Sequence, residues 1–208
     1  MSLLFDIGIV KKKDSKTENI FETLVSDFRK VEYTQPSDYI VQYWNIYKNK
    51  YNKDNVAING KIFELCLATL FIRENLLPFY MQARVAFVPN VNYDFILYTL
   101  QLGPIAISAK TTLRERYKQA DLEAVALKYV HRKSKCYLIT LDEPESRNVN
   151  KKITNGGLLG LDQSICALNN ELDGLIKHLK EYNYSIAPKV DIVESSILIT
   201  QDKIDQFK

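Results

Sequence analysis

The sequence predicts an α/β fold in which a central mixed β-sheet is flanked by helices. The order of the expected elements, which reads helix, strand, hairpin, helix, strand, is the first reason for this class. The second is periodicity, because apolar residues recur at helical spacing in some segments and form short β-branched or aromatic runs in others. The third is size, since 208 residues with a hydrophobic share of 46% are enough to build the core of one domain.

Helices are expected ahead of the sheet, after a short apolar and Lys-rich leader at residues 1–17. Apolar residues at helical spacing predict helices over 17–31 and 37–51. The aromatic side chains of the second helix are typical of a core, although they can also contact a partner. Residues 60–76 are apolar nearly all round, which predicts a central helix buried against the sheet.

Strands are expected next. A strand over 80–88 leads into a hairpin whose two strands are 93–100 and 104–109. The dipeptide Gly103-Pro104 marks the turn between them. The segment between Asn92 and Tyr129 is therefore the part of the chain around which we expect the rest to be organised.

The hairpin is expected to bring two charged side chains together. If it is centred near Leu102, Asp94 lies roughly opposite Lys110 at one end of the sheet. Because side chains alternate along a strand, Ser108 and Lys110 point to the face opposite the one that Ile107 occupies.

A helix is expected after the hairpin. Thr112 and Glu115 fit a capping box at its start. The apolar residues that should pack on the sheet are Leu113, Tyr117, Ala120, Ala124 and Leu127. Glu123 falls at the border of this buried face, from which its carboxylate can turn back toward Asp94 and Lys110.

The rest of the chain is expected to complete the sheet. Residues 134–141 predict a buried strand, and 164–182 look mostly helical. The polar segment 142–160 is expected to be a long loop, which is either functional or a disordered surface loop. One or two strands within 189–200 and a short amphipathic helix end the chain.

Composition narrows the compartment and the partners. The net charge of +3 is compatible with a nucleic-acid partner without demanding one. The cysteines lie far apart in apolar runs and form no zinc spacing with the histidines, which favours buried thiols in a reducing compartment. No apolar run approaches transmembrane length and the first residues do not resemble a signal peptide, so we expect a cytoplasmic protein with no membrane partner.

Two acids and a lysine at one end of a sheet indicate a specific chemistry. Two carboxylates repel each other unless a cation lies between them, and Mg²⁺ binds one or two carboxylates together with water and phosphate oxygens. A lysine beside such an ion can orient water or stabilise charge on a phosphate, as metal-assisted phosphodiester hydrolysis requires. From geometry alone, an ordinary ion pair beside a solvated helix face is the alternative.

The run KTTLRERYKQADLE at residues 110–123 carries a resemblance to known proteins. With Asp94 on the preceding strand, it resembles the PD-(D/E)xK nuclease superfamily. It is similar to the variant motif of the EcoRII-like and CCGG-family type II restriction endonucleases, in which the second acid has moved from the strand onto the following helix. Ser108 on the strand and Glu123 on the helix agree with that variant, whereas Tyr93 stands where the superfamily has Pro.

The resemblance implies a catalytic role for each matching residue. Asp94 and Glu123 would hold Mg²⁺, and Lys110 would assist the attacking water. Glu64, on the helix that precedes the hairpin, matches a further acid that reaches the site in family members. A surface acid or a helix-capping acid is the alternative for Glu64.

The same resemblance implies double-stranded DNA as a partner. Residues 114–116 match a triplet that reads G·C pairs in the major groove, and Arg and Glu suit the edges of guanine and cytosine. The alternative for the triplet is a solvated, charged start of a helix. The residues assigned to DNA binding are Arg114, Glu115, Arg116, Ser108, Lys118 and Gln119.

These expectations combine into a single nuclease domain over 1–208 with a restriction-endonuclease-like core. It would comprise a helical extension at 1–57, a catalytic core at 58–145, and a C-terminal part at 146–208 that completes the sheet and supplies a DNA-facing loop. The expected function is a Mg²⁺-dependent type II restriction endonuclease, acting as a homodimer on a short palindrome that contains G·C pairs. The alternatives are a repair or non-sequence-specific nuclease on the same core and an inactive DNA-binding relative.

Overall fold

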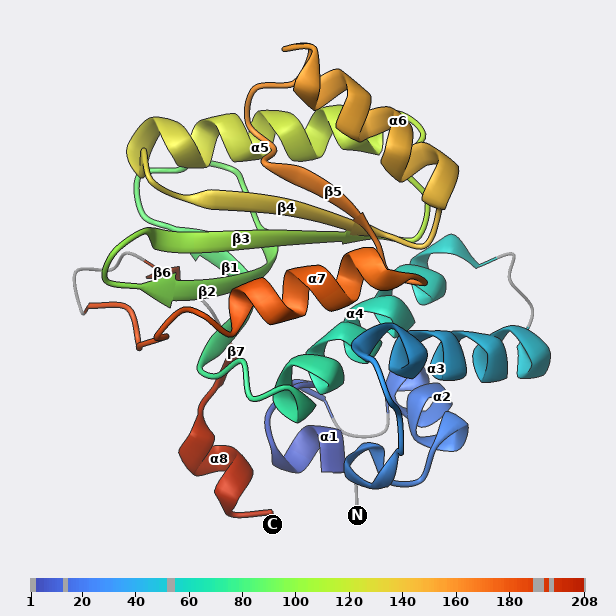
Figure 1. Ribbon diagram of the computed structural model, residues 1–208. Helices are drawn as coiled ribbons and strands as arrows, with labels where there is room; N and C mark the ends of the chain where they lie inside the picture. The colour runs from blue at the N-terminus through green and yellow to red at the C-terminus, as the bar shows by residue number, and fades with distance from the viewer. Residues whose placement is uncertain (1–2, 13–14, 52–54, 189–192, 195–196, 208) are drawn as a thin grey trace.

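The structure is a computed structural model that describes residues 3–12, 15–51, 55–188, 193–194 and 197–207. A mixed β-sheet crosses the middle of the molecule, and helices cover both of its faces (Figure 1). The N-terminal helices gather on one side of the sheet, so the predicted α/β class with an N-terminal helical extension is confirmed.

Except for the strand at 163–166, where a helix was predicted, the strands agree closely with the sequence prediction. They are β1 (Phe79–Val85), β2 (Tyr93–Thr99), β3 (Gly103–Lys110), β4 (Lys135–Thr140), β5 (Gln163–Cys166), β6 (Val193–Glu194) and β7 (Ile197–Ile199). The order across the sheet is β5-β4-β3-β2-β1-β6, and β7 pairs with another part of β1. The pairs β1–β2 and β2–β3 are antiparallel, whereas β3, β4 and β5 run parallel. Of the strands predicted within 189–200, residues 189–192 and 195–196 lie outside the described residues.

The helices form two layers. They are α1 (Leu3–Asp6), α2 (Lys16–Leu24), the 3₁₀ helix η1 (Phe28–Lys30), α3 (Pro36–Lys50), α4 (Val56–Arg73), α5 (Arg116–Val130), α6 (Glu143–Thr154), α7 (Asn170–Leu179) and α8 (Gln201–Asp205). In Figure 1, α5 and α6 cover one face of the sheet, and α4 and α7 cover the other. Successive side chains of β3 pack on opposite faces of the sheet. Ile107 joins the core under α4, whereas Ala106 joins the core under α5.

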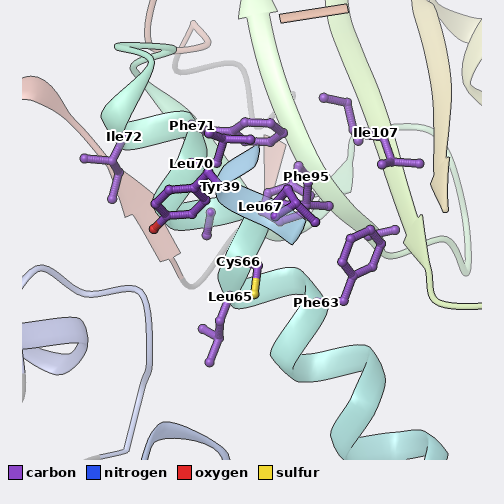
Figure 2. Close-up of a cluster of buried hydrophobic side chains, with 14 of the residues drawn as sticks. Tyr39, Phe63, Leu65, Cys66, Leu67, Leu70, Phe71, Ile72, Phe95 and Ile107 are labelled. Carbon is purple, nitrogen blue, oxygen red and sulfur yellow. The ribbon is translucent and has the colours of Figure 1, made fainter. Parts of the chain in front are cut away.

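The helix α4 is buried, as the sequence predicts. Asn55 caps it by accepting a hydrogen bond from the backbone N–H of Ile58 at 3.1 Å. The ring of Phe71 packs edge-on against Phe95, with ring centroids 5.2 Å apart (Figure 2). It packs in the same way against Phe79, at 5.9 Å. Each fully buried side chain of this size contributes roughly 1.5–3 kcal/mol. Through these contacts α4 joins the sheet to the N-terminal helices.

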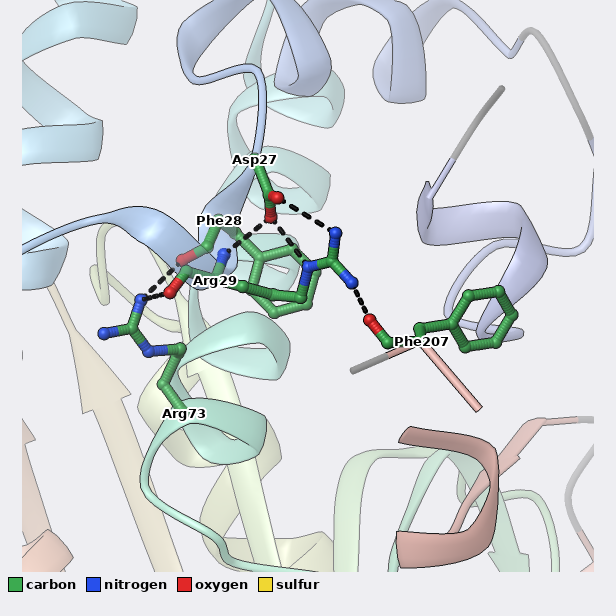
Figure 3. Close-up of polar contacts among 5 residues, drawn as sticks. All are labelled: Asp27, Phe28, Arg29, Arg73 and Phe207. Carbon is green, nitrogen blue, oxygen red and sulfur yellow. Dashed lines mark hydrogen bonds and ion pairs between the residues drawn. The ribbon is translucent and has the colours of Figure 1, made fainter. Parts of the chain in front are cut away.

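The helix predicted over 17–31 is wrong in its second half, where α2 ends and η1 follows. Asp27 caps η1 by accepting a hydrogen bond from the backbone N–H of Arg29 at 3.0 Å. Arg73, at the end of α4, donates to the carbonyls of Phe28 and Arg29 at 2.8 and 2.5 Å (Figure 3). A donor from a distant helix therefore satisfies these carbonyls, and periodicity within the segment does not reveal such a contact.

Two predictions for the C-terminal half are also corrected. Residues 142–160, expected to form a loop, contain α6, which Asp142 caps by accepting from the backbone N–H of Glu145 at 2.9 Å. Only a narrow side of α6, around Val149, is buried, so its polar composition concealed the helix. The helix predicted over 164–182 begins as strand β5, which pairs with β4, and becomes helical only in α7.

The thiols and the hydropathy agree with the sequence prediction. Cys66, Cys136 and Cys166 are free and buried. Burial raises the pKa of the Cys136 thiol to about 12, so this thiol stays protonated at neutral pH. Among the described residues, no helix is both long and apolar enough to cross a bilayer.

Candidate active site

The β2–β3 hairpin places Asp94 beside Lys110 at one end of the sheet. Lys110 Nζ lies 2.7 Å from Asp94 Oδ2, and the backbone N–H of Ala109 donates to the same oxygen at 2.8 Å. Phe95 pairs with Ile107, so the hairpin turns one residue earlier than predicted, and the long lysine side chain spans the difference. The predicted juxtaposition of carboxylate and ammonium is confirmed, with the carboxylate largely buried.

Glu123 lies on α5, which covers the face of the sheet toward which Lys110 points. Its backbone carbonyl accepts from the hydroxyl of Tyr93 at 2.9 Å, which ties this turn of α5 to the start of β2. Its carboxylate is half-buried and accepts from Gln119 Nε2 at 2.8 Å. Burial raises the pKa of the Glu123 carboxyl, the Gln119 hydrogen bond and Lys110 lower it, and the charge of Asp94 raises it. The charges of Asp94 and Lys110 thus both act on the Glu123 carboxyl, while its direct hydrogen-bond partner is Gln119.

Glu64 reaches the same place from α4, on the opposite face of the sheet. Burial, and then the charge of Asp94, raise the pKa of the Glu64 carboxyl to about 7, while Lys110 opposes the shift. Gln82 Nε2 donates to Glu64 Oε2 at 3.0 Å. The charges of Asp94 and Lys110 thus act on Glu64 from α4 and on Glu123 from α5, two helices on opposite faces of the sheet.

A groove of about 470 Å³ opens at Glu64 and Asp94. Glu64, Gln82 and Asp94 line it from the sheet and α4, and Lys61 lies beside them. Residues 9–12, next to α1, line the groove as well and include Lys11 and Lys12. The Glu64 and Asp94 carboxylates are thus flanked by lysines, whose positive charge suits a phosphate ester.

The donor set suits a hard cation. Within the part of the chain that the structure describes, no three His, Cys, Asp or Glu residues are grouped closely enough to hold a metal ion. Mg²⁺ needs fewer protein ligands, because it keeps several waters and usually takes one or two carboxylates plus phosphate oxygens. Asp94 and Glu123 offer such carboxylates.

The segment between β3 and α5 carries the charged triplet on its surface. Arg114, Glu115 and Arg116 are exposed, as are Lys118 and Gln119. Glu115 forms an ion pair with Lys118, one turn further along α5. The predicted capping box at Thr112 is wrong, because α5 begins only after Glu115 and makes no side-chain cap there.

A residue that the sequence did not single out holds this segment in place. The Glu145 carboxylate of α6 accepts hydrogen bonds from the backbone N–H groups of Leu113 and Arg114, the latter at 3.0 Å. Arg114 has a φ of +37°, a left-handed conformation that is strained for a residue with a side chain. The helix-start signal Asp-Glu-Pro-Glu at 142–145 would have revealed α6, although not this contact.

Ser108 differs from the other residues assigned to DNA. Its side chain is on β3, and the residue is only 7% exposed. Its predicted contact with DNA stays a prediction.

No protein-family model matches the sequence, and no curated protein matches it. A solved structure that does match is that of the restriction endonuclease PspGI with its substrate DNA. The match has a TM-score of 0.55 and 18% sequence identity, and it covers 95% of this chain and 90% of that one. The chain has a restriction-endonuclease-like fold. At this identity the likeness establishes the fold, so an argument about activity must rest on the residues of the site.

Proposed function

We propose that the protein is a type II restriction endonuclease that hydrolyses phosphodiester bonds of double-stranded DNA. The observation that carries this proposal is the ion pair of Lys110 with Asp94, whose charges also act on acids from α4 and α5, at one end of a restriction-endonuclease-like sheet. An ordinary surface ion pair does not require a second and a third acid beside it, since like charges raise each other's pKa.

The chemistry would be divided among four side chains. Asp94 and Glu123 would hold Mg²⁺, which supplies positive charge to the phosphate and a more acidic water. Lys110, fixed by Asp94, would orient the attacking water and stabilise the charge that develops on the phosphate oxygens. Glu64, whose pKa is about 7, would accept a proton near neutral pH.

Sequence readout would lie with the exposed triplet. Arg114 and Arg116 have the donors to bind guanine O6 and N7, and Glu115 can accept from cytosine N4. The structural neighbour was solved with its substrate DNA, which supports DNA as the partner. A short palindrome containing G·C pairs would be cut by a homodimer, because a twofold site matches a twofold protein.

Digestion of plasmid DNA with Mg²⁺ tests the proposal. We expect discrete bands from the native protein and no cleavage without a divalent ion. Lys110→Ala and Asp94→Ala should each lose cleavage by at least about 100-fold, as removal of a charge-stabilising group does, and should still bind the site. Lys177→Ala, an exposed lysine on α7, is the matched control and should cut normally. Light scattering of the protein bound to the duplex that it cuts gives the mass of the complex, which tests whether the protein is a dimer.

Other outcomes separate the alternatives. A smear in place of bands would favour a repair or non-sequence-specific nuclease on the same core. DNA that is bound but left uncut in Mg²⁺ would favour an inactive DNA-binding relative. Native activity in either Lys110→Ala or Asp94→Ala would contradict the assignment of the site.

A further inference from the structure

Gln82 has an unusual backbone for a residue inside a strand. Its φ is +48°, a left-handed conformation that disfavours side chains with a Cβ. It lies in β1 between the pairs Met81–Phe95 and Ala83–Tyr93, which puts it level with Asp94 on β2. Strained residues persist where the surrounding structure holds them, and they cluster at functional sites.

The side chain of Gln82 is held at both ends. Nε2 donates to Glu64 Oε2 at 3.0 Å, and Oε1 accepts from Asn92 Nδ2 at 2.7 Å. An ionised carboxylate can only accept, so the amide group of Gln82 directs its nitrogen to ionised Glu64 and its oxygen to Asn92. The chain Asn92, Gln82, Glu64 thus joins the segment before β2, the strand β1 and the helix α4.

Glu64 needs such a donor to stay where it is. Its carboxylate is near that of Asp94, which repels it, and Lys61 lies further out in the same groove. Without a fixed partner on the sheet, rotation toward Lys61 and solvent would relieve the repulsion. Gln82 opposes this rotation, because its nitrogen lies on the side of Glu64 that faces the sheet.

We propose that Gln82 is a positioning residue, which holds the Glu64 carboxylate beside Asp94 and Lys110 while Asn92 fixes the orientation of its amide. The proposal rests on the proposed function, in which Glu64 takes part in hydrolysis. It gives a purpose to the left-handed backbone, because turning β1 at this residue directs the side chain to α4.

A double-mutant cycle tests the proposal under single-turnover conditions. We expect Gln82→Ala to lower the cleavage rate by about 10- to 100-fold, the range seen when a group that orients an active residue is removed. The double variant Gln82→Ala/Glu64→Ala should cut no more slowly than Glu64→Ala alone, because Gln82 acts through Glu64. Without metal, Gln82→Ala should bind the duplex that the native protein cuts as tightly as the native protein does. A gel shift measures this.

Two further variants separate the amide from the backbone. Gln82→Gly removes the amide and relieves the left-handed strain, so it should be as slow as Gln82→Ala. Asn92→Ala keeps the bond to Glu64 but frees the amide, so its loss should be smaller and in the same direction. A native rate in Gln82→Gly would show that the side chain is dispensable and would overturn the proposal.

A spectroscopic measurement on metal-free protein gives a readout apart from activity. The Gln82 side-chain proton that bonds to Glu64 should resonate downfield in the native protein and move upfield in Glu64→Ala. Unfolding in urea checks that the variants fold. Multiplicative rate losses in the double variant, or weaker metal-free DNA binding in Gln82→Ala, would mean a direct role and overturn the positioning role.

The two proposals fail in different ways. If the native protein cuts no DNA, the proposed function fails and the positioning role falls with it. If the native protein cuts DNA and Gln82→Ala cuts at the same rate, only the positioning role fails.

Discussion

At the scale of single residues, Glu64 is the side chain whose chemistry depends most on its neighbours. Burial and the charge of Asp94 favour its protonated form, whereas Lys110, Gln82 and Lys61 favour its ionised form. The balance gives a pKa of about 7, so the carboxyl group exchanges a proton near the pH at which enzymes usually work.

This raised pKa predicts how stability depends on pH in metal-free protein. Because the folded-state pKa of about 7 exceeds the ordinary 4.5, Glu64 binds its proton more tightly when folded, and this contribution disappears as the pH rises through 7. Between pH 5 and pH 8, Glu64→Gln should therefore gain stability relative to the native protein, on the order of 1–3 kcal/mol. Urea unfolding with a chelator measures it.

A matched control accompanies that experiment. Glu32→Gln removes an exposed carboxyl group, so its unfolding free energy should follow the native curve at every pH. Parallel curves for Glu64→Gln and the native protein would show that Glu64 titrates normally.

The sequence predicted some site residues and missed others for a physical reason. Asp94 and Lys110 sit on adjacent strands of one hairpin, so alternation and a turn signal were enough to pair them. Glu123 followed from helical spacing on the next element. Gln82 and Asn92 act through contacts between strand, turn and helix, and a left-handed glutamine inside a strand has no signature in the sequence.

At the scale of elements, α6 supports the segment that presents the triplet. Its Glu145 satisfies two backbone N–H groups of that segment, and Lys152 on the same helix contacts the hydroxyl of Tyr117 on α5. Asp142 and Pro144 start the helix in the orientation that these contacts need. The helix is therefore a brace for the start of α5, whereas the sequence had left open a functional loop or a disordered surface loop.

This arrangement predicts a loss of discrimination in Glu145→Ala. Releasing two backbone N–H groups frees the triplet to move, and each lost hydrogen bond to a charged group is worth roughly 1.5–3 kcal/mol. We expect the ratio of cleavage at the cognate site to cleavage at sites with one altered base pair to fall by about tenfold or more.

The neighbouring Glu143→Ala is the control for Glu145→Ala. Glu143 is on the same helix and pairs with Arg147 at the surface, so its removal should leave the ratio unchanged. Equal ratios for Glu145→Ala and Glu143→Ala would contradict the bracing role of Glu145.

At the scale of the whole molecule, the net charge is small, although charged residues are spread over the chain. The chain has 28 basic and 25 acidic residues, a balance that gives little overall attraction for DNA. Attraction must therefore come from local clusters, and the groove has one, since Lys11, Lys12 and Lys61 line it beside the carboxylates.

Substitutions of these lysines and of the triplet should change DNA affinity in different ways. Lys61→Ala should weaken metal-free binding to all duplexes alike and lower the slope of log affinity against log salt by about 1. Arg114→Ala should instead weaken binding to the cognate site by about 1–3 kcal/mol and spare other sequences. Fluorescence anisotropy at several salt concentrations measures both, with Lys177→Ala as the control for charge. If the slope of log affinity against log salt is unchanged in Lys61→Ala, the groove does not contact the DNA.

The acids of the site are supplied from both sides of the sheet, Glu64 by α4 and Glu123 by α5. Because neither layer alone supplies both acids, the candidate site is complete only in a chain whose two layers have both packed on the sheet. Under the proposed function, a partly folded chain would therefore not yet cut DNA.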